Sequence, residues 1–266
     1  PAPGLRRVEV RLLAGGAVRN VGSGWVQVTP PAGPPPRSPM LGASMCFAEI
    51  PDPETFFRRA AQAGIRTLRL PFEWAEIEPE RGRFVWGKVD RIVAAAARWR
   101  VELVPTFIWE KPQPSWAGRG NVRKGMDQQH YPPEDLQRWK VYVGRAVARY
   151  RRTIRWWIPA NEPNLAKYWH PSPDPKAYVA LLKATWEAAR AADPNAKVLG
   201  CSVSGIDLGF LEACFREGAL RYCSAVGVHP YICPHRPDAR IPINILDPGS
   251  PLGTLADGLR MARALI

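Results

Sequence analysis

Polar and aromatic side chains stand where apolar segments of this sequence end. The clearest case is Asn161-Glu162-Pro163, which follows IRWWIPA (154–160), a pattern typical of a buried strand. An amide and a carboxylate are expensive to bury without partners. Other apolar segments end in the same way, on Glu49, Arg69, Glu73, Trp74, Trp109, Glu110, Ser202, Ser204, His229 and Tyr231. Polar side chains of these kinds can hydrogen-bond hydroxyl groups, and indole faces can stack on sugar rings. If the fold brings these residues into one cleft, that cleft would suit a carbohydrate.

The elements that must position these residues follow an alternating pattern. Short apolar runs, each long enough for one strand, occur at 41–50, 67–74, 101–110, 154–162, 197–205 and 225–232. Segments with helical spacing of apolar residues lie between them, at 53–64, 88–99, 134–151 and 175–194. Strands that are apolar on both faces and alternate with helices predict a parallel sheet covered by helices.

The size of the repeat favours an α/β fold of the (β/α)8 TIM barrel type. Six strand-helix units fill residues 41–266, at roughly 38 residues per unit, which fits such a barrel. A doubly wound sheet is the competing fold, but it would usually carry a Gly-rich loop after its first strand, and MCFAEIPDPE is not one. Because barrel sites lie at the carboxyl ends of the strands, Asn161 and Glu162 are expected to face the pocket.

The ends of the chain predict further organisation. Residues 1–30 partly alternate around Gly-rich turns, which indicates two antiparallel strands, either the tail of a β-type accessory domain or a strand pair packed on the main domain. A stiff proline-rich linker follows at 31–40. Residues 41–266 form the expected barrel domain. Its last segment, 255–266, reads as the helix after strand six, so the barrel is expected to be truncated after the sixth unit.

Three motifs resemble the retaining glycoside hydrolases of clan A, most closely the family 39-like and family 5-like members. They are Arg-x4-Trp in TLRLPFEW (67–74), Asn-Glu-Pro in WWIPANEPN (156–164), and His-Pro-Tyr in AVGVHPY (225–231), in the family's order. The likeness covers roughly 41–266. The chain departs from the usual Trp-x-Ile-Trp-Asn-Glu-Pro by having Pro159-Ala160 before the Asn.

The resemblance implies a role for each matching residue. Glu162 would be the general acid/base, and Asn161 would bind the substrate 2-hydroxyl. Arg69 would orient the nucleophile, while His229 and Tyr231 would lie beside the glycone. Trp74, Trp109 and Trp169 are further candidates for substrate binding, with Trp116 as another possible stacking residue. In a full-length version of the protein, the pKa of Glu162 is expected to be raised by burial and by the charge of the nucleophile.

The resemblance also requires a second carboxylate. Retaining glycosidases pair the acid/base with a nucleophile, which in this clan is a Glu at the end of strand seven. No Glu follows Glu217, so the nucleophile is expected downstream of this chain, which alone would be inactive. The predicted function is therefore that of a retaining O-glycosidase acting on β-linked oligo- or polysaccharides. A noncatalytic carbohydrate-binding barrel is the alternative, since the fold alone does not decide function.

The composition argues against other classes. The net charge is +13, but the basic residues are scattered and no basic-aromatic motif accompanies them, so no nucleic-acid partner is expected. No apolar run is long enough to span a membrane, and no cofactor or metal is predicted, because the spacing of His229, Cys233 and His235 fits no common zinc pattern. The five cysteines are read as small buried residues, with one disulfide possible among the last three. Polysaccharide substrates weakly favour a secreted or cell-envelope location.

Overall fold

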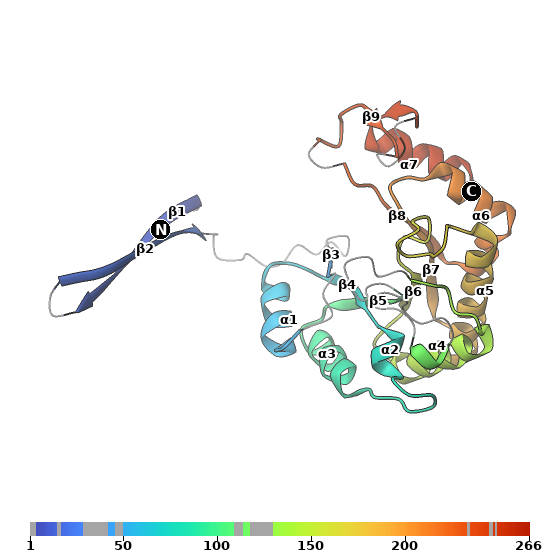
Figure 1. The fold of residues 1–266 in the computed structure, drawn as a ribbon, viewed down its shortest axis with the longest axis horizontal. Coiled ribbons are helices and arrows are strands. Elements are labelled where there is room, and N and C mark those ends of the chain that lie inside the picture. The colour runs from blue at the N-terminus through green and yellow to red at the C-terminus, as the bar shows by residue number, and fades with distance from the viewer. Residues whose placement is uncertain are drawn as a thin grey trace.

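The computed structural model describes residues 4–14, 17–28, 42–45, 50–108, 114–117, 130–232, 235–244, 247 and 249–266. Strands β1 (Gly4–Ala14) and β2 (Ala17–Val28) pair antiparallel, with a register irregularity between Leu12 and Leu13. Figure 1 shows this hairpin lying apart from the main body. The two strands predicted for residues 1–30 are therefore present, whereas the proline-rich segment at 31–40 lies outside the described residues.

The main body contains one six-stranded sheet whose order follows the sequence, β3-β4-β5-β6-β7-β8. Its strands are β3 Gly42–Ser44, β4 Thr67–Pro71, β5 Glu102–Ile108, β6 Trp156–Ala160, β7 Lys197–Ser204 and β8 Ala225–His229. All neighbours pair in parallel. The sheet curls, and the helices follow one another around its outside (Figure 1). This is the arrangement of six units of a (β/α)8 barrel, and the predicted fold class is confirmed.

The helices connect or follow these strands: α1 Pro53–Gln62, α2 Trp74–Ile77, α3 Gly87–Arg98, α4 Leu136–Tyr150, α5 Pro175–Ala192, α6 Leu208–Arg216 and α7 Leu255–Ala264, with 3-10 turns η1 Ser115–Ala117 and η2 Ala219–Tyr222. Several begin at residues whose side chains accept from the first-turn amides. Asp52 and Asp174 cap α1 and α5 ahead of a proline at the first helical position, and Thr254 with Asp257 forms a capping box on α7. These caps fix where each helix starts against the sheet.

Aromatic side chains fill the space between the sheet and α4. Phe107 of β5 stacks on Trp157 of β6 at 5.4 Å between ring centroids and meets Trp139 and Tyr142 of α4 edge-on. Trp139 donates from Nε1 to the Thr185 hydroxyl of α5 at 2.8 Å, so its polar atom is satisfied within the core. This packing anchors β5 and β6, whose ends carry candidate site residues.

The structure adds elements that the periodicity does not predict. Helix α2 is a single short turn after β4, and β9 (Ile241–Pro242) pairs with β10 (Leu252–Gly253) in a small antiparallel ladder. The helix predicted at 255–266 is α7. Elements of two to four residues are too short to show a period, which is why the sequence does not reveal them.

The main body contains free cysteines in its described part. Cys201, Cys214 and Cys223 are free thiols, so a bond between Cys214 and Cys223 does not form, while Cys46 and Cys233 lie outside the described residues. Burial, followed by the nearby Cys201, raises the pKa of the Cys223 thiol to about 11.

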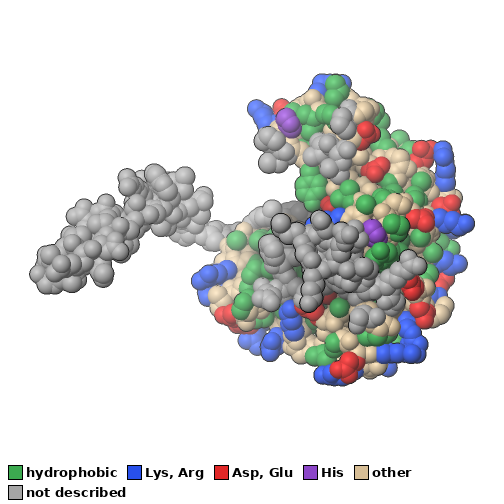
Figure 2. All heavy atoms as spheres, viewed as in Figure 1, with side chains coloured by type: hydrophobic (Ala, Val, Ile, Leu, Met, Phe, Trp, Pro, Cys, Tyr) green, Lys and Arg blue, Asp and Glu red, His purple; other side chains and the backbone are tan. Residues whose placement is uncertain are grey.

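Lys and Arg side chains are spread around the visible periphery of the main body (Figure 2). Within the described part of the chain, no helix is both long and apolar enough to cross a bilayer.

Candidate active site

Four of the predicted site residues meet at the carboxyl ends of the sheet strands. Arg69 is on β4, Asn161 and Glu162 follow β6 directly, and His229 ends β8. Their contacts form two linked pairs. Arg69 Nη2 donates to Asn161 Oδ1 at 2.7 Å, and His229 Nδ1 lies 2.8 Å from Glu162 Oε1. Because an ionised carboxylate only accepts, His229 donates from Nδ1 when Glu162 is charged.

The backbone of Asn161-Glu162 is held by both neighbouring strands. Asn161 N donates to the carbonyl of Ile108 at the end of β5 at 2.8 Å, and Glu162 N donates to the carbonyl of Ser202 in β7 at 3.0 Å. Glu162 has a φ of 44°, a left-handed conformation that is unfavourable for a residue with a side chain. Such a conformation costs about 1–3 kcal/mol and persists only where surrounding contacts impose it. The hydrogen bonds from Asn161 N to Ile108 and from Glu162 N to Ser202 hold the backbone in this conformation.

The carboxyl group of Glu162 is buried, with 5% of the residue exposed. Burial pushes its pKa upward, but the hydrogen bond and charge of His229, together with the hydroxyls of Tyr231 and Ser204, push it down further. In residues 1–266 the pKa is therefore lowered from its ordinary value. The raised pKa expected from the sequence refers to a full-length protein that contains the nucleophile, and it stays a prediction.

Arg69 fixes the orientation of the Asn161 amide. Its Nε donates to the Thr106 hydroxyl of β5 at 3.0 Å while Nη2 donates to Asn161 Oδ1. Both partners lie on the neighbouring strands β5 and β6, so the guanidinium is held at two points. Since Oδ1 accepts from Arg69, the side chain of Asn161 can donate further hydrogen bonds only from Nδ2.

The structure does not bring Trp74 or Trp169 to this cluster. Each is 2% exposed. Trp74 stacks on Tyr142 at 5.4 Å between centroids and donates from Nε1 to Glu78 Oε2 at 2.8 Å. Trp169 meets Tyr178 edge-on at 5.7 Å. Protein atoms cover both indoles because α2 and the segment after β6 turn them into the core, so neither offers a face to a sugar ring.

Of the other residues predicted at strand ends, some are exposed, some are buried, and some lie outside the described part of the chain. Tyr231 is 56% exposed beside His229, with the two ring centroids 6.4 Å apart. Trp109, Glu49 and Glu110 lie outside the described residues, and Glu73 is buried at the start of α2. No group of three His, Cys, Asp or Glu side chains among the described residues is placed to hold a metal ion.

Two residues of the site were not among the candidates. Thr106 is a polar residue inside the apolar strand VPTFI, so a search for polar residues at strand ends alone does not find it. Asn164 bridges the ends of β6 and β7, since its Nδ2 donates to the Ser204 carbonyl at 3.0 Å and its Oδ1 accepts from Ser204 N at 2.8 Å. Asn164 follows Asn-Glu-Pro directly, but only the fold shows that it contacts Ser204, one of the residues that lower the pKa of Glu162.

The sequence model of glycosyl hydrolase family 10 matches residues 61–200, which is more than half of the 266 residues. The chain belongs to glycosyl hydrolase family 10. The match includes Arg69, Asn161 and Glu162. Among characterised relatives, this family 10 chain is 32% identical over 103 residues to endo-1,4-beta-xylanase A of Fusarium oxysporum f. sp. lycopersici, covering 38% of the chain and 29% of the xylanase.

Solved structures share the fold of this family 10 chain. A family 39 glycoside hydrolase from Bacteroides cellulosilyticus WH2 superposes with a TM-score of 0.70 at 20% identity, covering 89% of this chain and 47% of that one. Xylanase 10B from Thermotoga maritima superposes with a TM-score of 0.52 at 15% identity, covering 85% and 67%. The predicted resemblance to clan A glycoside hydrolases is confirmed, with family 10 as the matching family. The matches span less than half of the Fusarium and Bacteroides proteins.

Proposed function

We propose that this chain provides the acid/base side of the active site of a retaining glycoside hydrolase that cleaves β-linked xylan-type polysaccharide. The observation that supports this most directly is the buried carboxyl of Glu162 at the carboxyl end of β6, hydrogen-bonded to His229 and adjacent to the Arg69-held Asn161. Membership of family 10 and the xylanase relatives support the substrate class.

In the proposed mechanism Glu162 acts twice. It first donates its proton to the glycosidic oxygen as the bond from that oxygen to C1 breaks, while a second carboxylate attacks C1 and forms a covalent glycosyl-enzyme. Glu162, now ionised, then takes a proton from water, whose oxygen attacks C1 and releases the second carboxylate. Asn161 would hydrogen-bond the sugar 2-hydroxyl, and the second carboxylate is expected from a Glu on a seventh strand.

The protonation of Glu162 is central to this proposal. His229, Tyr231 and Ser204 stabilise its ionised form, which suits the base but opposes the acid. A negatively charged nucleophile, about 5 to 5.5 Å away in retaining enzymes, would disfavour a second charge and raise the pKa of Glu162. Formation of the glycosyl-enzyme removes that charge, so the pKa would fall again when the base is needed. The hydrogen bonds described here would produce that lower value.

The decisive test compares leaving groups in the full-length protein, meaning residues 1–266 with whatever sequence flanks them naturally. Glu162→Gln should lower kcat on xylan by about 10²- to 10⁴-fold, the usual contribution of a general acid/base. Aryl β-xylosides with highly acidic phenols should form the glycosyl-enzyme nearly as fast as wild type, because their leaving groups need no proton. That step is read as the burst of released phenol.

Glu212→Gln is the matched control, since Glu212 is on α6 and pairs with Arg216. It should keep wild-type rates on both substrates. An equal loss on both substrates in Glu162→Gln would assign a structural role to Glu162. Wild-type protein that binds xylo-oligosaccharides without cleaving any of them would instead support a noncatalytic carbohydrate-binding barrel.

A further inference from the structure

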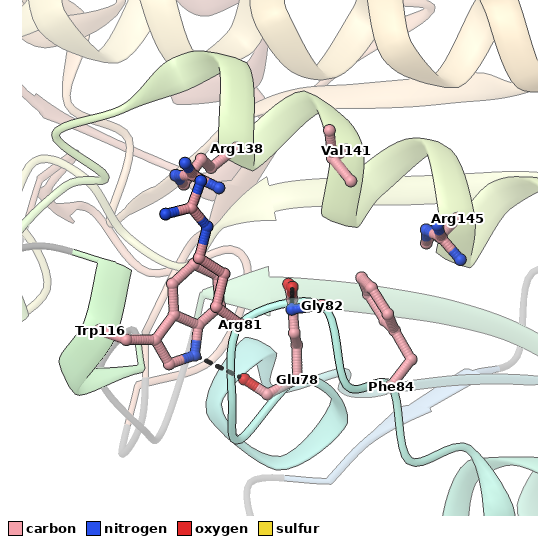
Figure 3. Close-up of a pocket in the computed structure, with 8 residues that line it drawn as sticks. All are labelled: Glu78, Arg81, Gly82, Phe84, Trp116, Arg138, Val141 and Arg145. Atoms are coloured by element: carbon pink, nitrogen blue, oxygen red, sulfur yellow. Dashed lines mark hydrogen bonds between the residues drawn. The ribbon is translucent and has the colours of Figure 1, made fainter.

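A second hollow lies outside the strand-end cluster. We call it the arginine pocket; it has a volume of about 340 Å³ and is lined by Glu78, Arg81, Gly82, Phe84, Trp116, Arg138, Val141 and Arg145 (Figure 3). Its walls come from the segment between α2 and α3, from η1 and from the exposed side of α4. It shares no residue with the pairs made by Arg69, Asn161, Glu162 and His229. The volume is at the lower end of the range for small-ligand sites, about 300–1,000 Å³.

The carboxylate that lines this pocket, that of Glu78, accepts hydrogen bonds from the protein itself. Glu78 is buried, its Oε2 accepts from Trp74 Nε1 at 2.8 Å, and its Oε1 accepts from Gly82 N at 2.8 Å. These donors satisfy one lone pair on each oxygen and turn the carboxylate toward the protein. Glu78 therefore shapes the floor of the pocket and leaves the arginine side chains to determine what the pocket attracts.

Three guanidinium groups line the pocket. Arg145 lies over the Phe84 ring, 4.9 Å from its centroid. Arg138 approaches Asp135 at 3.3 Å in a largely exposed pair, which water and salt weaken. Arg81 makes no ion pair within the part of the chain that the structure describes. Figure 3 shows Arg81 and Arg138 on the Trp116 side and Arg145 on the Phe84 side. Like charges in one hollow favour an anionic ligand.

The aromatic groups are fixed before any ligand binds. Trp116 donates from Nε1 to the Glu78 carbonyl at 3.0 Å and meets Trp74 edge-on at 5.5 Å, which holds its plane in one orientation. The ring is partly exposed at the pocket. An indole held in this way can stack on a sugar ring without an ordering cost, while nearby guanidiniums can bind a carboxylate through paired hydrogen bonds.

We propose that the arginine pocket binds a uronic acid substituent of the polysaccharide, with Trp116 against the sugar ring and Arg81 and Arg138 on its carboxylate. This rests on the proposed function in taking the ligand to be a carbohydrate. A stripe of cations would be expected for a nucleic acid, whose charges repeat along a line, whereas this site is a single hollow with aromatic walls. The pocket would thereby favour acidic over neutral chains.

The test is a binding measurement that does not depend on turnover. The full-length Glu162→Gln protein is titrated calorimetrically with a xylo-oligosaccharide carrying one glucuronic acid and with an unsubstituted one of equal backbone length. The acidic ligand should bind at least about tenfold more tightly, the effect of one charge-assisted hydrogen bond. Adding Arg81→Met and Arg138→Met should remove this preference and leave binding of the neutral ligand unchanged. Arg216→Met, an exposed arginine of α6, is the control and should keep the preference.

Three results would overturn the proposal. They are equal binding of the two ligands, a preference that survives loss of both arginines, and displacement of the acidic ligand by inorganic phosphate at similar concentration, which would indicate a general anion site. The outcome is separable from the proposed activity. If the wild type cleaves xylan but binds the acidic and neutral ligands equally, only the proposal for the arginine pocket fails. If the protein prefers the acidic ligand but cleaves no xylan, only the proposed catalytic function fails.

Discussion

Three side chains from different parts of the chain make the charged form of Glu162 favourable despite its burial. His229 ends β8, Tyr231 follows it, and Ser204 ends β7. Asn164 and Gly205 hold these ends in place, because Asn164 bonds both backbone groups of Ser204 and Gly205 N donates to the His229 carbonyl at 2.9 Å. The pKa of Glu162 therefore depends on how the ends of β7 and β8 are positioned relative to each other.

This network predicts a specific pH dependence of stability. The pKa of Glu162 is lower in the folded protein than its ordinary value, so its contribution is present above about pH 4.3 and is lost as pH falls through the folded pKa. For residues 1–266, which lack the proposed nucleophile, the melting temperature with Glu162 should therefore exceed that of Glu162→Gln near neutral pH, and the two should converge on acidification. Thermal unfolding of both proteins from about pH 7 to about pH 3 measures the difference. Curves that stay parallel would contradict the network.

At the scale of elements, the end of β7 contains an unusual bulge. Cys201 and Ser202 have φ values of 65° and 47°, and the pairing with β8 shifts register between Gly200 and Val203. Two contacts stabilise this shape. Cys201 N donates to the hydroxyl of Tyr178 on α5 at 2.6 Å, and the Ser202 carbonyl accepts from Glu162 N. The bulge thus links a buried phenol of α5 to the backbone of the candidate acid/base.

The close approach of β8 explains one glycine opposite this bulge. A Cβ on Gly227 would come within 2.8 Å of Ser202 Oγ and 3.1 Å of Ser202 Cα. Both distances are shorter than ordinary van der Waals contact. Strand β8 can therefore reach the bulged part of β7 only where it lacks a side chain.

The bulge predicts that Tyr178 is a positioning residue. Tyr178→Phe removes the acceptor of a buried N–H, which costs about 1–3 kcal/mol of stability. In the full-length protein it should also lower kcat on xylan severalfold with little change in KM, and shift the pH profile of kcat, because the backbone that carries Glu162 moves. Tyr222→Phe, on η2, is the control. A loss of stability with an unchanged kcat and pH profile would limit Tyr178 to a structural role.

At the scale of the whole molecule, β3 and β8 are the two outer strands of the described sheet. Every residue of β8 is half-buried, whereas the last five residues of β7 are fully buried. Strand edges with unpaired backbone groups associate readily with other chains. We propose that residues 41–266 form one barrel domain, joined through the linker at 31–40 to a β-type segment at 1–30.

This architecture predicts the behaviour of residues 1–266 expressed alone. They should not turn over aryl β-glycosides at an enzymatic rate, because the proposed nucleophile comes from a seventh strand. The outer strands β3 and β8 of the described sheet should also favour association with another chain, which gel filtration detects. A soluble monomer whose activity disappears in Glu162→Gln would place a nucleophile within these residues and refute the strand-seven assignment.

The sequence by itself determined the strand-helix alternation, because apolar runs and helical periodicity are local properties. It also predicted that Arg69, Asn161, Glu162 and His229 lie at strand ends on one rim, where the structure joins them in two hydrogen-bonded pairs, because the carboxyl ends of parallel strands meet there. Their roles in catalysis and binding stay predictions. Only the tertiary structure decided which aromatic groups are available, because the direction of an indole depends on elements as short as α2. It also decided the direction of the Glu162 pKa shift in residues 1–266, because burial raises this pKa while His229, Tyr231 and Ser204 lower it. Which effect is larger depends on the distances between distant strand ends, and no local sequence pattern encodes those distances.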